Sequence, residues 1–329
     1  MGTRLCVVGG GSWGTTIAAL GAQSTDTVLW VRRPELASEI NESHTNSAYL
    51  AEHRLPVSLR ATCALEDALS GCDVIAMAVP ARGMREVASR VAQFARPGIP
   101  ILSLAKGLER GTLKRMSEVI TEVAPGQPVA VLSGPNLAHE ILAGQPAASV
   151  VASGDSEIAK MLQDLLSRPT FRLYTNPDVI GCEIGGVVKN VVAIGAGIVQ
   201  GFGFGDNTRA TLVTRGLAEM SRLGVALGAN VLTFAGLAGM GDVMATCSSS
   251  QSRNTSVGIR LGHGESISEI ISSMKMVAEG VNSAASVLEL ARRHNVEMPI
   301  TEQVSAVCEG EVNAADALRA LMGRTNKPE

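Results

Sequence analysis

The chain has 329 residues, which is more than one hydrophobic core usually holds, so two domains are expected. Its net charge of -3 and its aromatic content of 3% argue against nucleic acid as a partner, because such binding relies on basic surfaces and stacking rings. Six scattered cysteines without a CxxC pair, and a start without the apolar region of a signal peptide, predict a cytoplasmic protein with free thiols.

The first half of the sequence alternates short apolar runs with helical patterns. The runs predicted as strands are 5–9, 27–31, 73–79, 99–104, 129–132, 148–152 and 171–174. Helical patterns lie between most of them, for example over 84–94 and from residue 66 onward. Continuous apolar runs are typical of parallel strands that are buried on both faces. The alternation therefore predicts βαβ units in a doubly wound α/β sheet.

The strand signal stops near residue 180. Helical patterns follow at 183–200, 208–227, 255–261, 266–274, 281–294 and 313–322, and Pro299 separates two of them. We therefore predict an α/β domain over residues 1–182 and an all-helical domain over residues 183–329. The apolar content of the helical domain makes a homodimer plausible.

Residues 184–205 are apolar enough to be considered as a membrane span. They nevertheless contain Lys189, Asn190, Gln200 and seven glycines, which favours a buried helix packed closely on its neighbours. No integral membrane association is therefore expected.

A glycine-rich turn, Gly-Gly-Gly-Ser-Trp-Gly at 9–14, follows the first predicted strand and opens a helix. This is the GxGxxG pattern in the position that dinucleotide binding requires. Gly9 permits the tight turn, Gly11 lets the backbone approach a pyrophosphate, and Gly14 allows close packing of helix on strand. The pyrophosphate would lie at the helix N-terminus. The alternative is a glycine-rich turn without a ligand.

The second predicted strand is followed by Arg32 and Arg33. Sites specific for NAD usually place Asp or Glu there, to bind the ribose 2′-hydroxyl. Arginine instead suits a 2′-phosphate, so the sequence predicts that NADP is accepted as well as NAD. The alternative is that both are exposed surface arginines.

Polar residues follow the predicted strands at the edge of the sheet where open α/β folds bind their ligands. Lys106 comes directly after one strand, and Gly134 and Asn136 begin a helix after another. A single loop lysine is more often an ordinary surface group, so Lys106 alone does not establish a site.

Lys189 is the only charged residue between Glu183 and Asp206, in an apolar helical pattern. A lysine is rarely buried there unless another group pairs with it. Because desolvation disfavours the ammonium form, such a lysine can exchange a proton at working pH. Lys189 is therefore predicted to carry acid–base chemistry.

Two polar clusters interrupt the apolar sequence of the same domain. In the first, Asp242 either pairs with the ammonium of Lys189 or caps a turn. In the second, Ser252, Arg253 and Asn254 combine hydroxyl, guanidinium and amide donors, which suit a phosphate or carboxylate. The histidines show no metal-ligand spacing, so no metal site is expected.

Together these motifs make the chain similar, over nearly its whole length, to the bacterial-type NAD(P)-dependent glycerol-3-phosphate dehydrogenases. The matching segments are 9–14, Asn46–Leu50, Ser103–Glu109, Ser133–Pro135, Glu183, Lys189–Asn190, Gly205–Ala210, Thr233–Asp242 and Ser252–Asn254. The resemblance implies an N-terminal Rossmann domain and a helical C-terminal domain like that of 6-phosphogluconate dehydrogenase. It implies interconversion of sn-glycerol 3-phosphate and dihydroxyacetone phosphate, for phospholipid synthesis.

The resemblance also implies roles for individual residues, with Lys189 as the proton acceptor. Substrate-binding residues would be Lys106, Gly134, Asn136, Lys189, Asp242, Ser252, Arg253 and Asn254. Cofactor-binding residues would be Gly9, Gly11, Ser12, Trp13, Gly14, Arg32, Arg33, Lys106, Ala138, Arg253, Val277 and Glu279. Many relatives have serine at the positions of Asn136 and Ala81, so the substrate contact at Asn136 can differ in detail.

Two alternatives stay open on the sequence. A ketopantoate or hydroxyacid reductase shares this architecture and differs in its substrate, which is not a phosphorylated ketone. A nucleotide-sensing protein would bind the cofactor without turnover, but it leaves the isolated Lys189 without a role.

Overall fold

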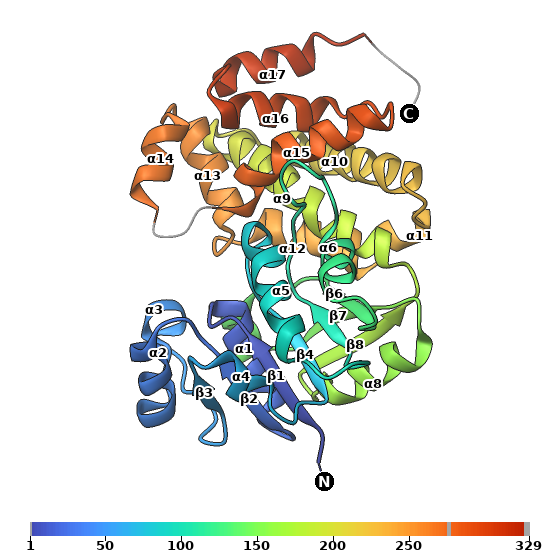
Figure 1. The fold of residues 1–329 in the computed structure, drawn as a ribbon. Coiled ribbons are helices and arrows are strands. Elements are labelled where there is room, and N and C mark those ends of the chain that lie inside the picture. The colour runs from blue at the N-terminus through green and yellow to red at the C-terminus, as the bar shows by residue number, and fades with distance from the viewer. Residues whose placement is uncertain (1, 275–277, 326–329) are drawn as a thin grey trace. The chain divides into compact units, whose positions relative to one another are not determined.

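The protein is described by a computed structural model that covers residues 2–274 and 278–325 (Figure 1). The chain forms two compact units, of which the first runs through residue 109 and continues over residues 114–182, while the second contains residues 110–113 and the chain from residue 183 onward. An α/β sheet in the first unit and helices in the second confirm the predicted fold class.

The first unit is built on an eight-stranded sheet with the strand order β3-β2-β1-β4-β5-β6-β7-β8. Its strands are β1 (Arg4–Val8), β2 (Asp26–Trp30), β3 (Arg60–Thr62), β4 (Val74–Met77), β5 (Ile101–Ser103), β6 (Val129–Ser133), β7 (Ala147–Ala152) and β8 (Phe171–Asn176). The order reverses at β1, so β1 and β4 flank the switch point where doubly wound folds bind ligands.

Two details of the sheet differ from the sequence prediction. Strand β3 was not predicted, because three residues are too few to show a pattern. Strand β7 pairs antiparallel with β6, whereas the other neighbouring pairs are parallel. Strand direction leaves no trace in the sequence, since an apolar run reads the same both ways.

Helices cover both faces of this sheet. Along β1 the side chains of Leu5 and Val7 join one hydrophobic core and those of Cys6 and Val8 join the other, as the period of two requires. The first core packs against α1 (Ser12–Gly21), α2 (Pro34–Ser38), η1 (Glu39–Ser43), α7 (Ala138–Leu142) and α8 (Ser156–Leu166). The second packs against α4 (Leu65–Leu69), η2 (Ala81–Gly83), α5 (Met84–Phe94) and α6 (Met116–Val123). A short helix, α3 (Ser47–Leu50), follows η1.

The second unit contains only helices in its described part. They are α9 (Val179–Gly201), α10 (Asp206–Ala226), α11 (Val231–Phe234), η3 (Leu237–Gly241), α12 (Asp242–Ser248), α13 (Arg253–Gly262), α14 (Ile267–Ser273), α15 (Glu279–Arg293), α16 (Pro299–Glu309) and α17 (Ala314–Met322). Helices α11, α12 and α16 were not predicted. Pro299, which was expected to separate helices, instead begins α16, where the missing N–H of proline costs nothing.

Helix α9 begins at Val179, so the chain passes from the first unit to the second inside a helix. By length and composition, the segments Val179–Gly201 and Val231–Ser248 could each span a membrane. The apolar window of the first is 83% buried within the protein, as in a core helix, and that of the second is 44% buried.

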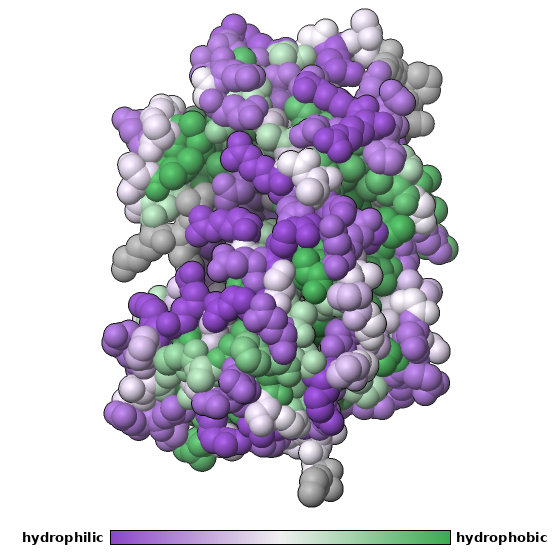
Figure 2. Space-filling view, in the orientation of Figure 1, coloured by the Kyte–Doolittle hydropathy of each residue, from purple (hydrophilic) through white to green (hydrophobic). Residues whose placement is uncertain are grey.

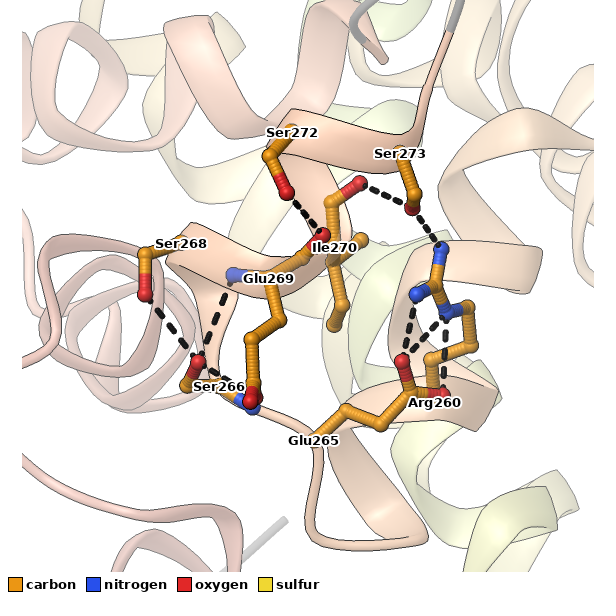
Figure 3. Close-up of polar contacts among 8 residues, drawn as sticks. All are labelled: Arg260, Glu265, Ser266, Ser268, Glu269, Ile270, Ser272 and Ser273. Atoms are coloured by element: carbon orange, nitrogen blue, oxygen red, sulfur yellow. Dashed lines mark hydrogen bonds and ion pairs between the residues drawn. The ribbon is translucent and has the colours of Figure 1, made fainter.

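A polar cluster fixes the connection between α13 and α14 (Figure 3). Nε of Arg260 donates to both carboxylate oxygens of Glu265, at 3.0 and 2.9 Å, and Nη1 donates to Oγ of Ser273 at 2.8 Å. Ser266 and Glu269 form a capping box at the start of α14. Arg260 therefore contacts the residues just before and at the end of α14.

Candidate functional site

The glycine-rich turn lies directly after β1, and α1 begins at Ser12. Gly9 has φ of +123°, and a Cβ there would lie 2.6 Å from the carbonyl oxygen of Ala78, so only glycine fits. A Cβ on Gly14 would lie 2.0 Å from the carbonyl oxygen of Gly9. Nothing lies within 4 Å of the Cβ position of Gly11. Backbone atoms therefore fill the space next to Gly9 and Gly14, where α1 packs against β1, and the space next to Gly11 is empty.

The N-terminus of α1 fits a negatively charged group. Gly11 is its N-cap and supplies no side-chain hydrogen bond, and the first turn contains no acidic residue. The first N–H groups of the helix are thus not capped by a side chain, and these groups favour anions such as a pyrophosphate. The residues present therefore fit a dinucleotide at this position.

Asn46, the first residue of the matching segment Asn46–Leu50, supports the turn through its side chain. Its side chain is fully buried, and Nδ2 donates to the carbonyl oxygen of Gly10 at 3.1 Å and to Oγ1 of Thr15 at 2.9 Å. Nε1 of Trp13 is buried without a hydrogen-bond partner among the described residues, and its ring meets Phe171 edge-on. Buried donors normally find an acceptor, so Trp13 is open to a polar ligand.

Arg32 and Arg33 follow β2 and are exposed. A Cβ on Gly10 would lie 2.5 Å from Cγ1 of Val31, so the end of β2 packs against the glycine-rich turn. Neither arginine makes a hydrogen bond or ion pair with another residue of the described ranges. Exposed arginines at this place could bind a 2′-phosphate. The same exposure is also typical of ordinary surface arginines.

Lys106 and Gly134 connect the ends of the adjacent strands β5 and β6. Nζ of Lys106 donates to the carbonyl oxygen of Gly134 at 2.9 Å. Gly134 has φ of +145°, and a Cβ there would lie 2.7 Å from Oγ of Ser149. Both amide atoms of Asn136 are buried without a partner in the described part of the chain. Such unsatisfied atoms indicate a place for a polar ligand.

In the second unit Lys189 lies on α9 and is 9% exposed. Its Nζ lies 3.1 Å from Oδ1 of Asp242 and donates to Oγ1 of Thr246 at 2.7 Å. Oγ1 of Thr246 donates in turn to Oδ1 of Asp242 at 3.3 Å. The pairing expected between Lys189 and Asp242 is therefore present. An ammonium has three N–H donors, and these contacts use two of them.

Thr246 was not singled out in the sequence. Its signal was the spacing of four from Asp242, which places both side chains on one face of α12. Cys247 lies next to Thr246, and burial raises the pKa of its thiol to about 12. The thiol is therefore neutral at working pH and does not compete as a nucleophile.

In the predicted cluster of residues 252–254, two side chains are buried and hydrogen-bonded within the protein, and the third is exposed. Ser252 caps α13 and accepts from the backbone N–H of Thr255. Nδ2 of Asn254 donates to Oδ1 of Asn190, and Oδ1 of Asn254 accepts from the backbone N–H of Gly280, both at 2.9 Å. Arg253 is exposed and pairs with no carboxylate of the described chain.

Two further predicted cofactor residues lie at the starts of helices, and a third lies outside the residues that the structure describes. Ala138 is the first residue of α7, and Glu279 is the first residue of α15. Val277 lies outside the described residues.

The chain is similar to known glycerol-3-phosphate dehydrogenases over nearly its whole length. The family model for the NAD-dependent glycerol-3-phosphate dehydrogenase N-terminus matches residues 4–159. The family model for the C-terminus of the same enzymes matches residues 178–319. A glycerol-3-phosphate dehydrogenase from Sphingopyxis alaskensis is 50% identical over 322 residues, which cover 98% of this chain and 97% of that protein. One from Thermobifida fusca is 51% identical, with 99% and 98% covered.

Solved structures agree with this result. Glycerol-3-phosphate dehydrogenase from Coxiella burnetii has a TM-score of 0.94 and 36% identity, and the match covers 98% of this chain and 99% of that one. A ketopantoate reductase from Ralstonia eutropha has a TM-score of 0.63 and 14% identity, which shows a shared fold alone. The chain therefore belongs to the NAD-dependent glycerol-3-phosphate dehydrogenase family.

Proposed function

We propose that this protein interconverts sn-glycerol 3-phosphate and dihydroxyacetone phosphate with NADP or NAD, and that it supplies glycerol 3-phosphate for phospholipid synthesis. The observation that carries the proposal is the buried group of Lys189, Asp242 and Thr246, in which one ammonium N–H is left for a ligand. The curated relatives named for this reaction are about half identical to the chain.

The proposed reaction needs a proton at the substrate oxygen. The chemistry supplied by the bound nicotinamide is hydride transfer at substrate C2. In reduction, Lys189 donates a proton to the oxygen as it becomes a hydroxyl, through the N–H that neither Thr246 nor Asp242 accepts. In oxidation, the neutral amine of Lys189 takes the hydroxyl proton back.

Asp242 and Thr246 hold Lys189 in place, and Asp242 is in addition a proposed substrate contact. The carboxylate compensates the buried ammonium charge, which would otherwise be costly. The two contacts also fix the direction of Nζ, so that the third N–H has a defined orientation. Lys106 and Asn190 are proposed to steady the oxygen where negative charge develops.

Arg253 is the proposed ligand of the substrate phosphate. It is exposed, has no carboxylate partner in the described chain, and offers a planar pair of donors that suits phosphate. Binding the remote phosphate orients the reacting carbon. The other proposed substrate contacts are Lys106, Gly134, Asn136, Asp242, Ser252 and Asn254.

The first domain, residues 1–182, is proposed to hold the dinucleotide, and residues 183–329 to form the substrate domain. The open space at Gly11 and the uncapped start of α1 support a pyrophosphate there. The proposed cofactor contacts are Gly9, Gly11, Ser12, Trp13, Gly14, Arg32, Arg33, Lys106, Ala138, Arg253, Val277 and Glu279.

We further propose a cytoplasmic homodimer without integral membrane association. Large apolar side chains of the second unit are exposed, namely Phe204, Val225, Val231, Leu232, Met240 and Met244. Figure 2 shows hydrophobic patches among the hydrophilic side chains of the viewed face. Apolar surface of this kind favours association between protein chains. Sedimentation at micromolar concentration distinguishes monomer from dimer, and a monomer would overturn this part.

The test of the reaction is an absorbance assay of dihydroxyacetone phosphate reduction with NADH and NADPH side by side. We expect oxidation of at least one cofactor, and no oxidation of either would overturn the proposal. A folded Lys189→Ala variant should lose about 10² to 10⁴ in rate, the usual contribution of a proton-transfer group. Ketopantoate in the same assay tests the alternative reductase, which would turn over ketopantoate instead.

A further inference from the structure

We propose that Gly185 is a positioning residue for the Lys189–Asp242 pair. The missing side chain at Gly185 lets the π-helical turn η3 approach α9 closely enough for the pair to form. The inference rests on the proposed role of Lys189 in proton transfer, and it adds a residue that touches neither substrate nor cofactor.

The contact of Gly185 with Ala238 and the contact of Lys189 with Asp242 lie one helical turn apart, where α9 packs against η3 and the start of α12. Gly185 and Lys189 are four residues apart on α9, so they lie on the same face, one turn apart. Ala238 and Asp242 have the same spacing, and the π-helical turn η3 ends immediately before Asp242. A Cβ on Gly185 would lie 2.4 Å from the carbonyl oxygen of Ala238. One turn later, Nζ of Lys189 lies 3.1 Å from Oδ1 of Asp242.

The backbone of η3 cannot easily move away from a larger residue at this position. The atom that a Cβ would meet belongs to the main chain, so no side-chain rotation relieves the overlap. On its other side η3 is held by α11, because a Cβ on Gly239 would lie 2.3 Å from the carbonyl oxygen of Phe234. Phe234 is itself 1% exposed. Thus η3 is enclosed between Gly185 and Phe234.

A methyl group at Gly185 therefore acts on the ion pair. An ordinary contact begins at 3.4 Å, so relief of the overlap requires a displacement of about 1 Å. The carboxylate of Asp242 follows η3 directly, and a shift of that size lengthens a 3.1 Å contact beyond hydrogen-bond distance. Lys189 would then lose its counter-charge and its fixed orientation.

The test compares Gly185→Ala with Gly201→Ala on the same helix. A Cβ on Gly201 would lie 2.3 Å from the carbonyl oxygen of Ile259, so the two substitutions have similar steric consequences. Gly201 is the last residue of α9, and the atoms nearest to its Cβ position belong to Ile259 and Gly262, which are not members of the Lys189 group. We expect similar decreases in Tm for both variants. Only Gly185→Ala should lower kcat for reduction, by about 10²-fold, the effect of a misplacement near 1 Å.

The separate effects on kcat and KM give a readout that general destabilisation does not move. Gly185→Ala should change the direction of Nζ of Lys189 and leave Arg253, the proposed phosphate ligand, in place. In Gly185→Ala, kcat should therefore fall by much more than KM for dihydroxyacetone phosphate rises, whereas Gly201→Ala should change neither. The dissociation constant for NADPH should stay within about twofold in both variants.

Further variants separate positioning from other effects. Asp242→Glu in the Gly185→Ala background lengthens the carboxylate and should restore part of kcat. Asp242→Asn combined with Gly185→Ala should add little to either single change, because both remove the same contact. Equal kcat for Gly185→Ala and Gly201→Ala, or a Gly185→Ala chain that does not fold when Gly201→Ala does, would overturn the inference. An inactive wild-type enzyme would instead overturn the proposed function, and a crystal structure of Gly185→Ala still tests the lost pair.

Discussion

Oδ1 of Asp242 lies 3.1 Å from Nζ of Lys189, and the two residues are 1% and 9% exposed. Thr246 is hydrogen-bonded to both groups, so the two buried charges and this hydroxyl form one hydrogen-bonded set. Because removal of one partner leaves a buried charge uncompensated, this set supports stability as well as the proposed proton transfer.

The first prediction concerns that set. Asp242→Asn should lower the free energy of unfolding by about 3 kcal/mol, because the ammonium stays buried without its counter-charge. Urea unfolding followed by circular dichroism measures the change. The matched control is Asp206→Asn, since Asp206 is exposed and pairs with Arg209 on the surface of α10. That variant should change stability by less than about 1 kcal/mol, and equal effects in the two variants would contradict the prediction.

The second prediction concerns the open glycine. Gly11 has φ of -74° and ψ of 178°, which any residue adopts, and nothing lies within 4 Å of its Cβ position. Gly11→Ala should therefore leave Tm unchanged and raise the NADPH dissociation constant about tenfold or more, because the methyl group occupies the space of the pyrophosphate. Gly154→Ala, at an equally open position, is the control for both measurements. Unchanged cofactor affinity in Gly11→Ala would contradict the proposed site.

The third prediction concerns cofactor choice. Arg33→Gln should raise KM for NADPH about 10- to 100-fold while KM for NADH changes little, because only NADPH carries the 2′-phosphate. Arg90→Gln is the control, since Arg90 lies on α5 with its guanidinium 5.5 Å from the ring centre of Trp30. If both cofactors respond equally to Arg33→Gln, the arginine does not read the phosphate.

The fourth prediction concerns a buried carboxylate away from the site. Glu219 accepts from the backbone N–H groups of Ile300 and Thr301, at 2.6 and 3.0 Å, at the start of α16. In Glu219→Gln an NH2 group replaces one of the two acceptor oxygens and leaves a buried N–H donor without a partner, which should lower the free energy of unfolding by about 2 kcal/mol. The matched control is Glu302→Gln, because Glu302 lies in the first turn of α16 and its side chain is 47% exposed.

The same carboxylate predicts a pH dependence. Burial raises the pKa of Glu219 above its usual value, although its hydrogen bonds oppose the rise. Its contribution is therefore fully present below the unfolded pKa, about 4.3, and is lost as the pH rises through the higher folded value. The stability difference between wild type and Glu219→Gln should narrow with rising pH in urea titrations. A difference that widens instead would contradict the raised pKa.

Local patterns predicted most of the secondary structure. Apolar runs located the strands from β1 to β8 except β3, and periodicity located α5 with the bounds that the structure shows. The elements that were missed are short or irregular, such as α11 and η3, and one-turn elements carry too few residues for a period to appear. Helix α16 was missed because Pro299 was taken as a separator of helices rather than as a first residue.

The candidate cofactor site was predictable where its signal is local. The glycine spacing of the turn at 9–14 can be recognised within six residues, although Asn46 and Ala78, far along the chain, also contact the turn. Asn254 shows the opposite case, since its amide links Asn190 on α9 to Gly280 on α15. A sequence pattern cannot indicate that an amide contacts partners so distant along the chain.

The sequence by itself determined the alternation of strands and helices, the glycine-rich turn, and the isolation of Lys189 in an apolar helix. These features depend on the backbone conformation and the hydrophobicity of residues that are close together in the sequence. Only the tertiary structure decided which groups meet Lys189. Thr246 lies 57 residues away along the chain, and the contact depends on how closely η3 packs against Gly185 of α9. Packing distance between helices is a property of surfaces in contact, so it exists only once the chain has folded.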